Sequence, residues 1–328
     1  MIISQTPLRI SLAGGGVDFP EFYKREDGFV VSSAIDKYVF VIATRRYDDK
    51  IYVNYSQKEI VDNVSQVKHE LVRSAMEITG VKQGIEITLL SDVPSQGSGL
   101  GSSSSFAVGL LNVLYHYQGI QVSAKRLAEE ACKIEIEVCG KPIGKQDQYI
   151  AAYGGVQSFK FLKSGEVEVE PLSLPRKCLR DLSDRLFLFY TNLTRSSNII
   201  LSEQNKRTDS NMDQLKVIKS LAVDVDQALR RGDLDVVGKV LRENWAIKKT
   251  LATSISNPKI DDMHTLAMSA GAMGAKISGA GGGGFLLVYC PASARESLLK
   301  IMEDYREMPF SIEPFGSKII LNYSRAEW

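Results

Sequence analysis

A glycine- and serine-rich loop at residues 94–105, Pro-Ser-Gln-Gly-Ser-Gly-Leu-Gly-Ser-Ser-Ser-Ser, leads directly into an apolar helical pattern. Glycines let the backbone turn its N–H groups toward a ligand without obstruction by a Cβ atom. The helix that follows adds free N–H groups and the positive end of its dipole. The loop can therefore hold a phosphate, with serine hydroxyls within reach of a metal ion. A flexible linker can have the same composition, but the helix that abuts this loop argues against a linker.

The loop matches neither of the two best-known phosphate-binding signatures. No Gly-Lys-Ser/Thr closes it, so it is not a Walker A loop. Gly97, Gly99 and Gly101 also break the Gly-x-Gly-x-x-Gly spacing of dinucleotide-binding proteins.

Two further glycine-rich segments flank this loop in the chain. Residues 6–20, TPLRISLAGGGVDFP, place Arg9 on a strand ahead of three glycines and Asp18, and residues 276–285, KISGAGGGGF, place four glycines before a strand. Glycines let a ligand or another loop lie against the backbone, and Asp18 can accept hydrogen bonds from hydroxyl groups. Each segment alone is compatible with a structural turn, but three in this order are hard to obtain by chance.

Strand patterns separated by turns dominate the N-terminal half. Residues 8–12 alternate, residues 38–44 form a buried-strand run, and residues 85–90 lead into the loop. Residues 51–55 follow a polar turn after the 38–44 run, so we expect these two strands to form a hairpin.

Helical and further strand patterns follow the loop. Apolar residues from Phe106 to Tyr117 mark one helix face, and a second helix is expected to begin at its N-cap Ser123 and to end at Gly140. Further strands are expected at 156–161, 167–170, 186–190 and 285–289, and further helices at 212–232, 233–253, 260–271 and 294–306. The change to mainly helical patterns predicts a domain boundary near residue 190. The alternative is a single continuous domain.

Composition excludes several classes of function. The chain has 328 residues, of which 44% are hydrophobic, and a formal net charge of only +1. This charge does not favour a nucleic-acid partner, and no basic amphipathic or long apolar run favours a membrane. Four cysteines without Cys-x-x-Cys spacing indicate small core residues in a cytoplasmic protein. We expect a small-molecule substrate and a monomer or homodimer.

Together, the three glycine-rich motifs strongly resemble those of the GHMP kinase superfamily, which includes galactokinase, homoserine kinase and mevalonate kinase. The resemblance covers nearly the whole chain. It implies an α+β fold with an N-terminal ATP-binding domain like ribosomal protein S5 at 1–190. It also implies a ferredoxin-like C-terminal domain at 191–328, with the active site between the two domains.

The resemblance also implies ligands for ATP and Mg²⁺. The residues expected to hold the ATP triphosphate are Gly97, Ser98, Gly99, Leu100, Gly101, Ser102 and Ser103. Ser103 and Glu135 would coordinate Mg²⁺, which prefers hard oxygen ligands. Glu137 is expected on another side of the same helix. The adenine pocket is expected among residues 47–65, with Tyr55 and Val61 as candidates.

The same resemblance places a catalytic pair and a sugar site. Asp147 would take the proton from the sugar hydroxyl or orient that hydroxyl, and both roles remain open. Arg9 beside it would offset charge on the transferred phosphoryl group. The residues expected at the substrate are Asp18, Gly15, Gly16, Arg195, Gly281 and Gly282. Arg195 would bind a phosphate already on the substrate; a surface arginine is the alternative.

Three segments are similar to those of the sugar kinases that phosphorylate D-glycero-D-manno-heptose 7-phosphate at C1: GGGVDF, CGKPIGKQDQY and YTNLTRSS. The resemblance implies an ATP-dependent anomeric kinase that supplies heptose 1,7-bisphosphate for nucleotide-heptose and surface glycans. One alternative is a kinase of an unphosphorylated sugar such as L-fucose or galactose. Another is a non-catalytic sensor of sugar and ATP, which would be expected to lose Asp147, Glu135 or the loop serines.

Overall fold

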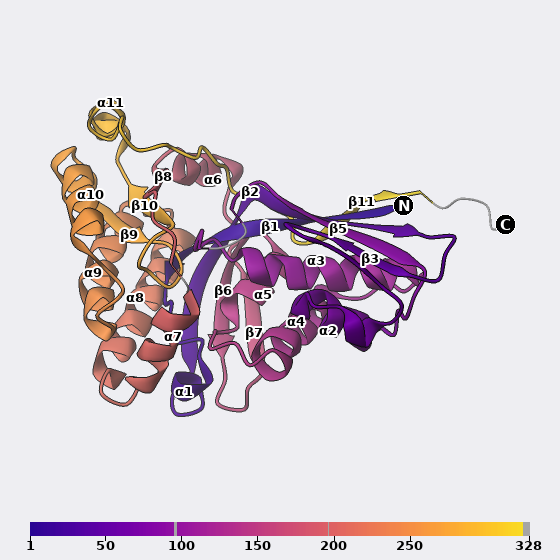
Figure 1. The fold of residues 1–328 in the computed structure, drawn as a ribbon. Helices are drawn as coiled ribbons and strands as arrows, with labels where there is room; N and C mark the ends of the chain where they lie inside the picture. Colours follow the sequence, from indigo (N-terminus) through magenta and orange to yellow (C-terminus); the bar gives the residue numbers. More distant parts are fainter. Residues whose placement is uncertain (95–96, 196, 324–328) are drawn as a thin grey trace.

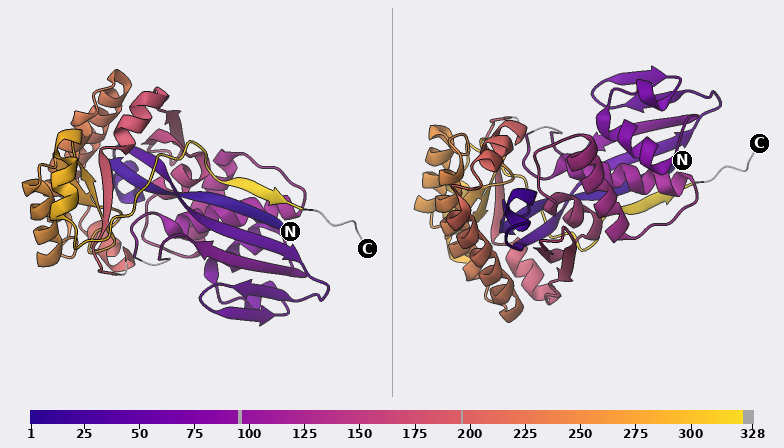
Figure 2. Two further views of the ribbon diagram at one scale, coloured as in Figure 1. Left: turned by 90° about the horizontal axis from the view of Figure 1, so that it is seen from above. Right: turned by 90° about the horizontal axis from the view of Figure 1, so that it is seen from below.

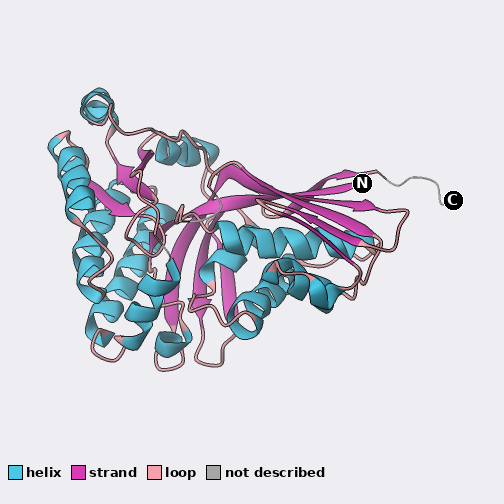
Figure 3. Ribbon diagram, viewed as in Figure 1, coloured by secondary structure: helices cyan, strands magenta, loops and turns pink. Residues whose placement is uncertain are grey.

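The computed structural model describes residues 1–94, 97–195 and 197–323. A long, twisted sheet occupies one end of the molecule and a smaller sheet with a group of helices occupies the other, as Figure 1 and Figure 3 show. The expected α+β fold of the GHMP kinases is confirmed.

The large sheet has eight strands in the described residues. Its main path runs β11-β1-β2-β5-β3-β4, and β6 and β7 continue from β2. The bounds are β1 Ile2–Ala13, β2 Gly28–Arg45, β3 Ile51–Asn54, β4 Lys58–Val61, β5 Ile85–Ser91, β6 Val156–Phe161, β7 Val167–Pro171 and β11 Lys318–Asn322. The first strand, β1, pairs with both β2 and β11, so the end of the chain returns to the strand where the chain begins.

The predicted hairpin of residues 38–44 and 51–55 is wrong. Strand β5 lies between the two segments, antiparallel to β2 and parallel to β3. The inward side chains of β5, Ile85, Ile87 and Leu89, are buried. Strand β5 also has a hydrogen-bonded neighbour on each side, β2 and β3, which stabilises it further. The short β3 then pairs on its other edge with β4. Strands that are adjacent in sequence often pair, but burial of a more apolar strand can override that tendency.

Helices cover one face of the large sheet. The helices and short helical turns of this part are α1 Pro20–Tyr23, η1 Val64–Gln66, α2 Glu70–Thr79, α3 Ser102–Tyr117, α4 Ala124–Cys132, the π-helix η2 Lys133–Val138, α5 Gln146–Tyr153 and α6 Arg176–Ser183. Helix α3 is buried along most of its length and lies against β1 and β2 (Figure 1). Gly109 allows this close approach, because a Cβ there would lie 2.9 Å from Thr6 Oγ1. As predicted, Ser123 caps α4.

The smaller sheet has the order β8-β10-β9, with β8 Leu186–Tyr190, β9 Gly274–Ile277 and β10 Phe285–Tyr289. Around it lie α7 Ser197–Lys206, α8 Met212–Arg231, α9 Asp235–Leu251, α10 Pro258–Ser269, the turn η3 Ala292–Ala294 and α11 Arg295–Ile301. Backbone hydrogen bonds also join β8 to the segment around Glu307. The chain order is therefore β8, the helices α7 to α10, β9, β10, α11 and then the bridged segment around Glu307, which follows the ferredoxin-like β-α-β-β-α-β pattern with extra helices after β8 and a bridge in place of the last strand.

Strand β1 connects the two parts of the molecule. From Thr6 to Ala13 every residue is buried on both faces of the strand, with α3 on one side and α8 and α9 on the other. Figure 2 shows the helices of the smaller part gathered around this end of β1. The domain boundary near residue 190 remains a prediction. Among the described helices, none has both the length and the apolar character needed to cross a membrane.

Candidate active site

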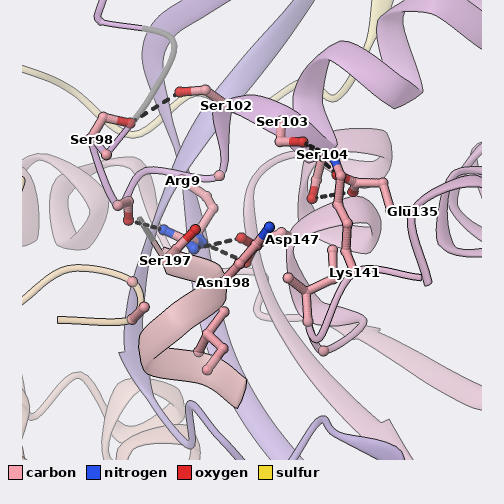
Figure 4. Close-up of a pocket in the computed structure, with 18 of the residues that line it drawn as sticks. Arg9, Ser98, Ser102, Ser103, Ser104, Glu135, Lys141, Asp147, Ser197 and Asn198 are labelled. Carbon is pink, nitrogen blue, oxygen red and sulfur yellow. Dashed lines mark hydrogen bonds and ion pairs between the residues drawn. The ribbon is translucent and has the colours of Figure 1, made fainter. Parts of the chain in front are cut away.

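A cleft of about 1050 Å³ lies where the two parts of the molecule meet. Its walls come from segments that are far apart in the sequence: β1 and the loop after it, the loop before α3, the start of α5, α7, α9 and the loop after β9. Figure 4 shows the polar side chains of several of these segments converging on the cleft.

The glycine- and serine-rich loop is packed against the glycine-rich loop of residues 276–285. Gly99 has a left-handed backbone, with φ +71°, and a Cβ there would lie 2.3 Å from the carbonyl oxygen of Ser278. Gly101, at φ +79°, is the N-cap of α3. A side chain at position 99 would push the two loops apart. A side chain at position 101 would disfavour the left-handed backbone with which α3 begins at the cleft. The hydroxyls of Ser98 and Ser102 lie 3.1 Å apart on this wall.

Arg9 and Asp147 form the central ion pair. Arg9 Nε donates to Asp147 Oδ1 at 2.7 Å and Nη2 donates to Oδ2 at 2.6 Å (Figure 4). Arg9 Nη1 also donates to the carbonyl oxygen of Gly99 at 2.5 Å. The arginine side chain is buried, whereas the Asp147 side chain is 23% exposed on the cleft side. The pair can therefore offer a fixed carboxylate to a ligand.

Glu135 is completely buried, and its carboxylate is surrounded by donors. Ser103 donates to Oε1 and Ser104 to Oε2, both at 2.6 Å, and Gln148 Nε2 donates to Oε2 at 2.7 Å. Lys141 Nζ lies 3.0 Å from Glu135 Oε1 and 2.7 Å from Ser103 Oγ. The Lys141 ammonium is thus held by Ser103 Oγ and Glu135 Oε1, which belong to the two residues that the sequence predicts as Mg²⁺ ligands.

These two oxygens fit a magnesium ion, because both are hard ligands that converge on one cation position. Mg²⁺ usually keeps several waters and binds few protein groups. Accordingly, the described residues contain no group of three or more histidine, cysteine, aspartate or glutamate side chains suited to a metal. Glu137 is exposed, as expected.

Asp18 is buried beside the start of α5. It accepts hydrogen bonds from the backbone N–H of Gly16 at 3.1 Å, and from Gln146 N at 3.2 Å and Nε2 at 3.3 Å. Burial raises the pKa of Asp18, and the charge of Asp147 raises it further. Gly144 leaves room for this carboxylate, since a Cβ there would lie 2.0 Å from Asp18 Oδ2.

Most of the predicted site residues meet in the cleft. Those that line it are Arg9, Gly15, Gly16, Asp18, Gly97, Ser98, Gly99, Gly101, Ser102, Ser103, Glu135, Asp147 and Arg195. Leu100 is instead a core residue. Gly281 and Gly282 lie behind the wall, where a Cβ on either would crowd the 254–255 backbone. Ser95 and Ser196, in the predicted loop and in the YTNLTRSS segment, lie outside the described residues.

The adenine and phosphate candidates differ in their positions. Tyr55 and Val61 both pack against the core, and of these two Tyr55 lines the cleft, whose lining also includes the apolar residues Leu89 and Phe106. Arg195 is exposed at the cleft, immediately before α7.

Two lysines on the cleft wall were missed by the interpretation of the sequence. Lys248 on α9 and Lys276 on β9 are both buried and line the cleft. Burial lowers the pKa of Lys248 to about 8, and the charge of Arg9 adds to this effect. Burial also lowers the pKa of Lys276 well below its usual range. Lys276 opens the third glycine-rich motif, so its position in that motif was the available signal.

Comparison with known proteins shows which family the chain resembles along its length. Residues 62–155 match the family model described as GHMP kinases N terminal domain, and residues 227–306 match GHMP kinases C terminal. The chain is 31% identical to a D-glycero-alpha-D-manno-heptose 7-phosphate kinase of Campylobacter jejuni, across 92% of this chain and 93% of the relative. It is 27% identical to a galactokinase of Pyrococcus furiosus, across 86% of this chain and 87% of the relative.

Similarity to a solved structure extends over almost the whole of both chains. A D-glycero-D-manno-heptose 1-phosphate kinase from Bacteroides thetaiotaomicron superposes with a TM-score of 0.83 at 25% identity, covering 99% of this chain and 100% of the other.

Proposed function

The chain belongs to the GHMP kinase family and is an ATP-dependent kinase, and we propose that it phosphorylates the C1 hydroxyl of D-glycero-D-manno-heptose 7-phosphate. The observation that carries this proposal is the Arg9–Asp147 pair, which faces a cleft between the glycine-serine loop and Asp18. The Campylobacter relative supports the choice of sugar. The product would be the 1,7-bisphosphate, a precursor for nucleotide-activated heptose.

The chain's own residues position both partners of the transfer. Backbone N–H groups of the loop 97–103 bind the triphosphate at the N-terminus of α3. Asp18 accepts hydrogen bonds from sugar hydroxyls, and Asp147 orients the C1 hydroxyl and accepts its proton as the new bond forms. Arg9 holds that carboxylate and neutralises charge on the transferred group. Phosphoryl transfer depends mainly on such alignment and charge compensation.

Ser103 and Glu135 would hold Mg²⁺. The ion, when bound, would neutralise the phosphate oxygens of the nucleotide. When the ion is bound, Lys141 must either leave its contact with Glu135 or share Ser103 and Glu135 with the ion. A cytoplasmic location and a monomeric or homodimeric state remain predictions.

The test is ADP release by the purified protein with Mg-ATP and a panel of acceptors. The panel contains heptose 7-phosphate, free heptose, mannose, L-fucose, galactose and mevalonate. Turnover confined to heptose 7-phosphate is the expected result. Turnover on free L-fucose or galactose would replace the proposed acceptor, and ATP binding without ADP from any acceptor would indicate the sensor instead.

A further inference from the structure

Buried polar side chains from three elements share one wall of the cleft. On β1, Ser11 is two residues after Arg9 and therefore on the same face of the strand. On α9, Asn244 and Lys248 are four residues apart and share one helix face. Lys276 projects from β9 beside them, and its pKa is lowered by the charges of both Lys248 and Arg9. All of these side chains line the cleft.

Two buried hydrogen-bond donors on this wall have no acceptor among the described residues. In the described part of the chain, the Ser11 hydroxyl and the Asn244 Nδ2 have no hydrogen-bond partner although both are buried. Lys276 Nζ makes one long contact, 3.4 Å to the carbonyl oxygen of Leu12. Lys248 Nζ donates to the carbonyl oxygen of Gly279. Among the described side chains, no carboxylate forms an ion pair with either ammonium.

Such an arrangement is unfavourable in the free protein. A buried ammonium that no carboxylate contacts costs free energy, and burial lowers the pKa of both Lys248 and Lys276. For Lys248, the charges of Asp18 and Asp147 offset this effect only in part. Unpaired buried donors add a further penalty. A ligand that brings negative charge and several acceptors would remove both penalties.

The buried donors indicate which kind of ligand would bind at this wall. A phosphate monoester has three terminal oxygens that accept hydrogen bonds, and it carries close to two negative charges at neutral pH. A sugar hydroxyl would bring no charge to compensate the two ammonium groups. The phosphates of the nucleotide have their own proposed donors in the loop 97–103 and at the start of α3, and none of the four side chains of this wall belongs to that loop or helix. Lys248 interacts electrostatically with Asp18, which is the residue proposed for the sugar.

We propose that Ser11, Asn244, Lys248 and Lys276 form the subsite that binds the phosphate already present on the sugar. This inference rests on the proposed function for the identity of the sugar, and it transfers the role first predicted for Arg195 to a buried site. Because the subsite is desolvated, its charges act more strongly on a bound phosphate than an exposed arginine would. A substrate without the phosphate would leave the donors unpaired, so the subsite would select for phosphorylated sugars.

The test compares Lys248→Met with Lys249→Met. Methionine keeps the length of the lysine side chain without its charge. Lys249 is the next residue on α9, but its side chain is 38% exposed and pairs with Asp261 on the surface. Steady-state ADP release gives the KM for heptose 7-phosphate and the KM for ATP. Binding of heptose 7-phosphate without ATP is measured by calorimetry.

For Lys248→Met we expect the KM and Kd for heptose 7-phosphate to rise by at least about tenfold, while the KM for ATP stays within about threefold. Lys249→Met should leave all of these values unchanged. The free Lys248→Met protein should also melt at a higher temperature than the parent, because a buried uncompensated charge is removed. A purely structural lysine would give a lower melting temperature.

Equal increases in the KM for heptose 7-phosphate and in the KM for ATP in Lys248→Met would overturn the proposal. So would a selective loss in Arg195→Ala together with none in Lys248→Met. If the protein forms no ADP with any sugar, the proposed function fails, but the calorimetric comparison still decides whether Lys248 binds the sugar phosphate. Ser11→Ala provides a second variant with the same expectation, a weaker Kd for heptose 7-phosphate, and a smaller change in packing.

Discussion

Arg9 joins the Asp147 carboxylate to the glycine-serine loop through a single guanidinium. Its Nε and Nη2 donate to the two oxygens of Asp147 at 2.7 and 2.6 Å, and its Nη1 donates to the carbonyl oxygen of Gly99 at 2.5 Å. A planar guanidinium with fixed donors sets both the distance and the angle between its partners. The acceptor side and the nucleotide side of the cleft are therefore aligned by the same side chain.

Replacement of this carboxylate should affect turnover more than binding. We expect Asp147→Asn to lower kcat by roughly 10²- to 10⁴-fold, because general-base and orienting contributions are of that size. The KM for ATP should change little, since the loop 97–103 is intact. Steady-state ADP release measures both constants, and an unchanged melting temperature would show that the variant is folded. A kcat within tenfold of the parent would remove Asp147 from the reaction.

Replacement of the buried glutamate should raise the requirement for Mg²⁺. Glu135→Gln keeps the shape of the side chain but removes the charge that would hold the ion, so we expect at least a tenfold increase in the Mg²⁺ concentration for half-maximal activity. Binding of Mn²⁺ followed by electron paramagnetic resonance gives a measurement independent of turnover. Glu137→Gln is the control, because Glu137 is exposed two residues away. Equal Mn²⁺ affinity in parent and Glu135→Gln would contradict the assignment.

The contact between the two glycine-rich loops can be tested separately from backbone strain. Gly99→Ala places a Cβ 2.3 Å from the Ser278 carbonyl oxygen, whereas Gly119, also left-handed with φ +76°, has no atom within 4 Å of such a Cβ. Each alanine should cost about 1–2 kcal/mol of unfolding free energy from the left-handed backbone. Gly99→Ala should cost more and should weaken ATP binding, as urea denaturation and calorimetry would show. Equal losses of stability would mean that the loops separate without cost.

The buried carboxylate of Asp18 should reduce stability at neutral pH. Because its pKa is raised in the folded protein, the folded state keeps a proton that the unfolded chain releases above about pH 4. The free energy of unfolding therefore falls as the pH rises through the folded pKa, and ionised Asp18 costs stability at pH 7. We expect Asp18→Asn to raise the free energy of unfolding at pH 7 by roughly 1 kcal/mol, with a smaller gain near pH 4.

The same variant should bind the sugar more weakly, which calorimetry would detect. Denaturation of parent and variant at both pH values tests the sign of the stability change. A variant less stable than the parent at pH 7 would mean that the hydrogen bonds from Gly16 and Gln146 outweigh the cost of burial.

Local patterns predicted several elements and motifs correctly. The strand at residues 8–12, the helix that includes Phe106 to Tyr117 and the Ser123 cap are all present in the structure, although residues 8–12 are buried on both faces rather than alternating. Among the elements that were not predicted, β9, β11 and α5 are short and their apolar residues do not form a clear period. Helix α2 was also missed, although its buried residues Leu71, Val72, Ala75, Met76 and Thr79 follow a helical period. No helix was predicted around Asp147, which lies in the first turn of α5.

The sequence by itself determined the three glycine-rich motifs, the acidic residues beside them and the family that these imply. Their chemistry depends on residue type and short spacing, which are visible in the chain. Only the tertiary structure decided that β5 separates β2 from β3, and that Lys248 and Lys276 share a buried wall with Asn244. These relationships depend on which apolar surfaces are buried together, and burial is a property of the whole fold rather than of any local segment.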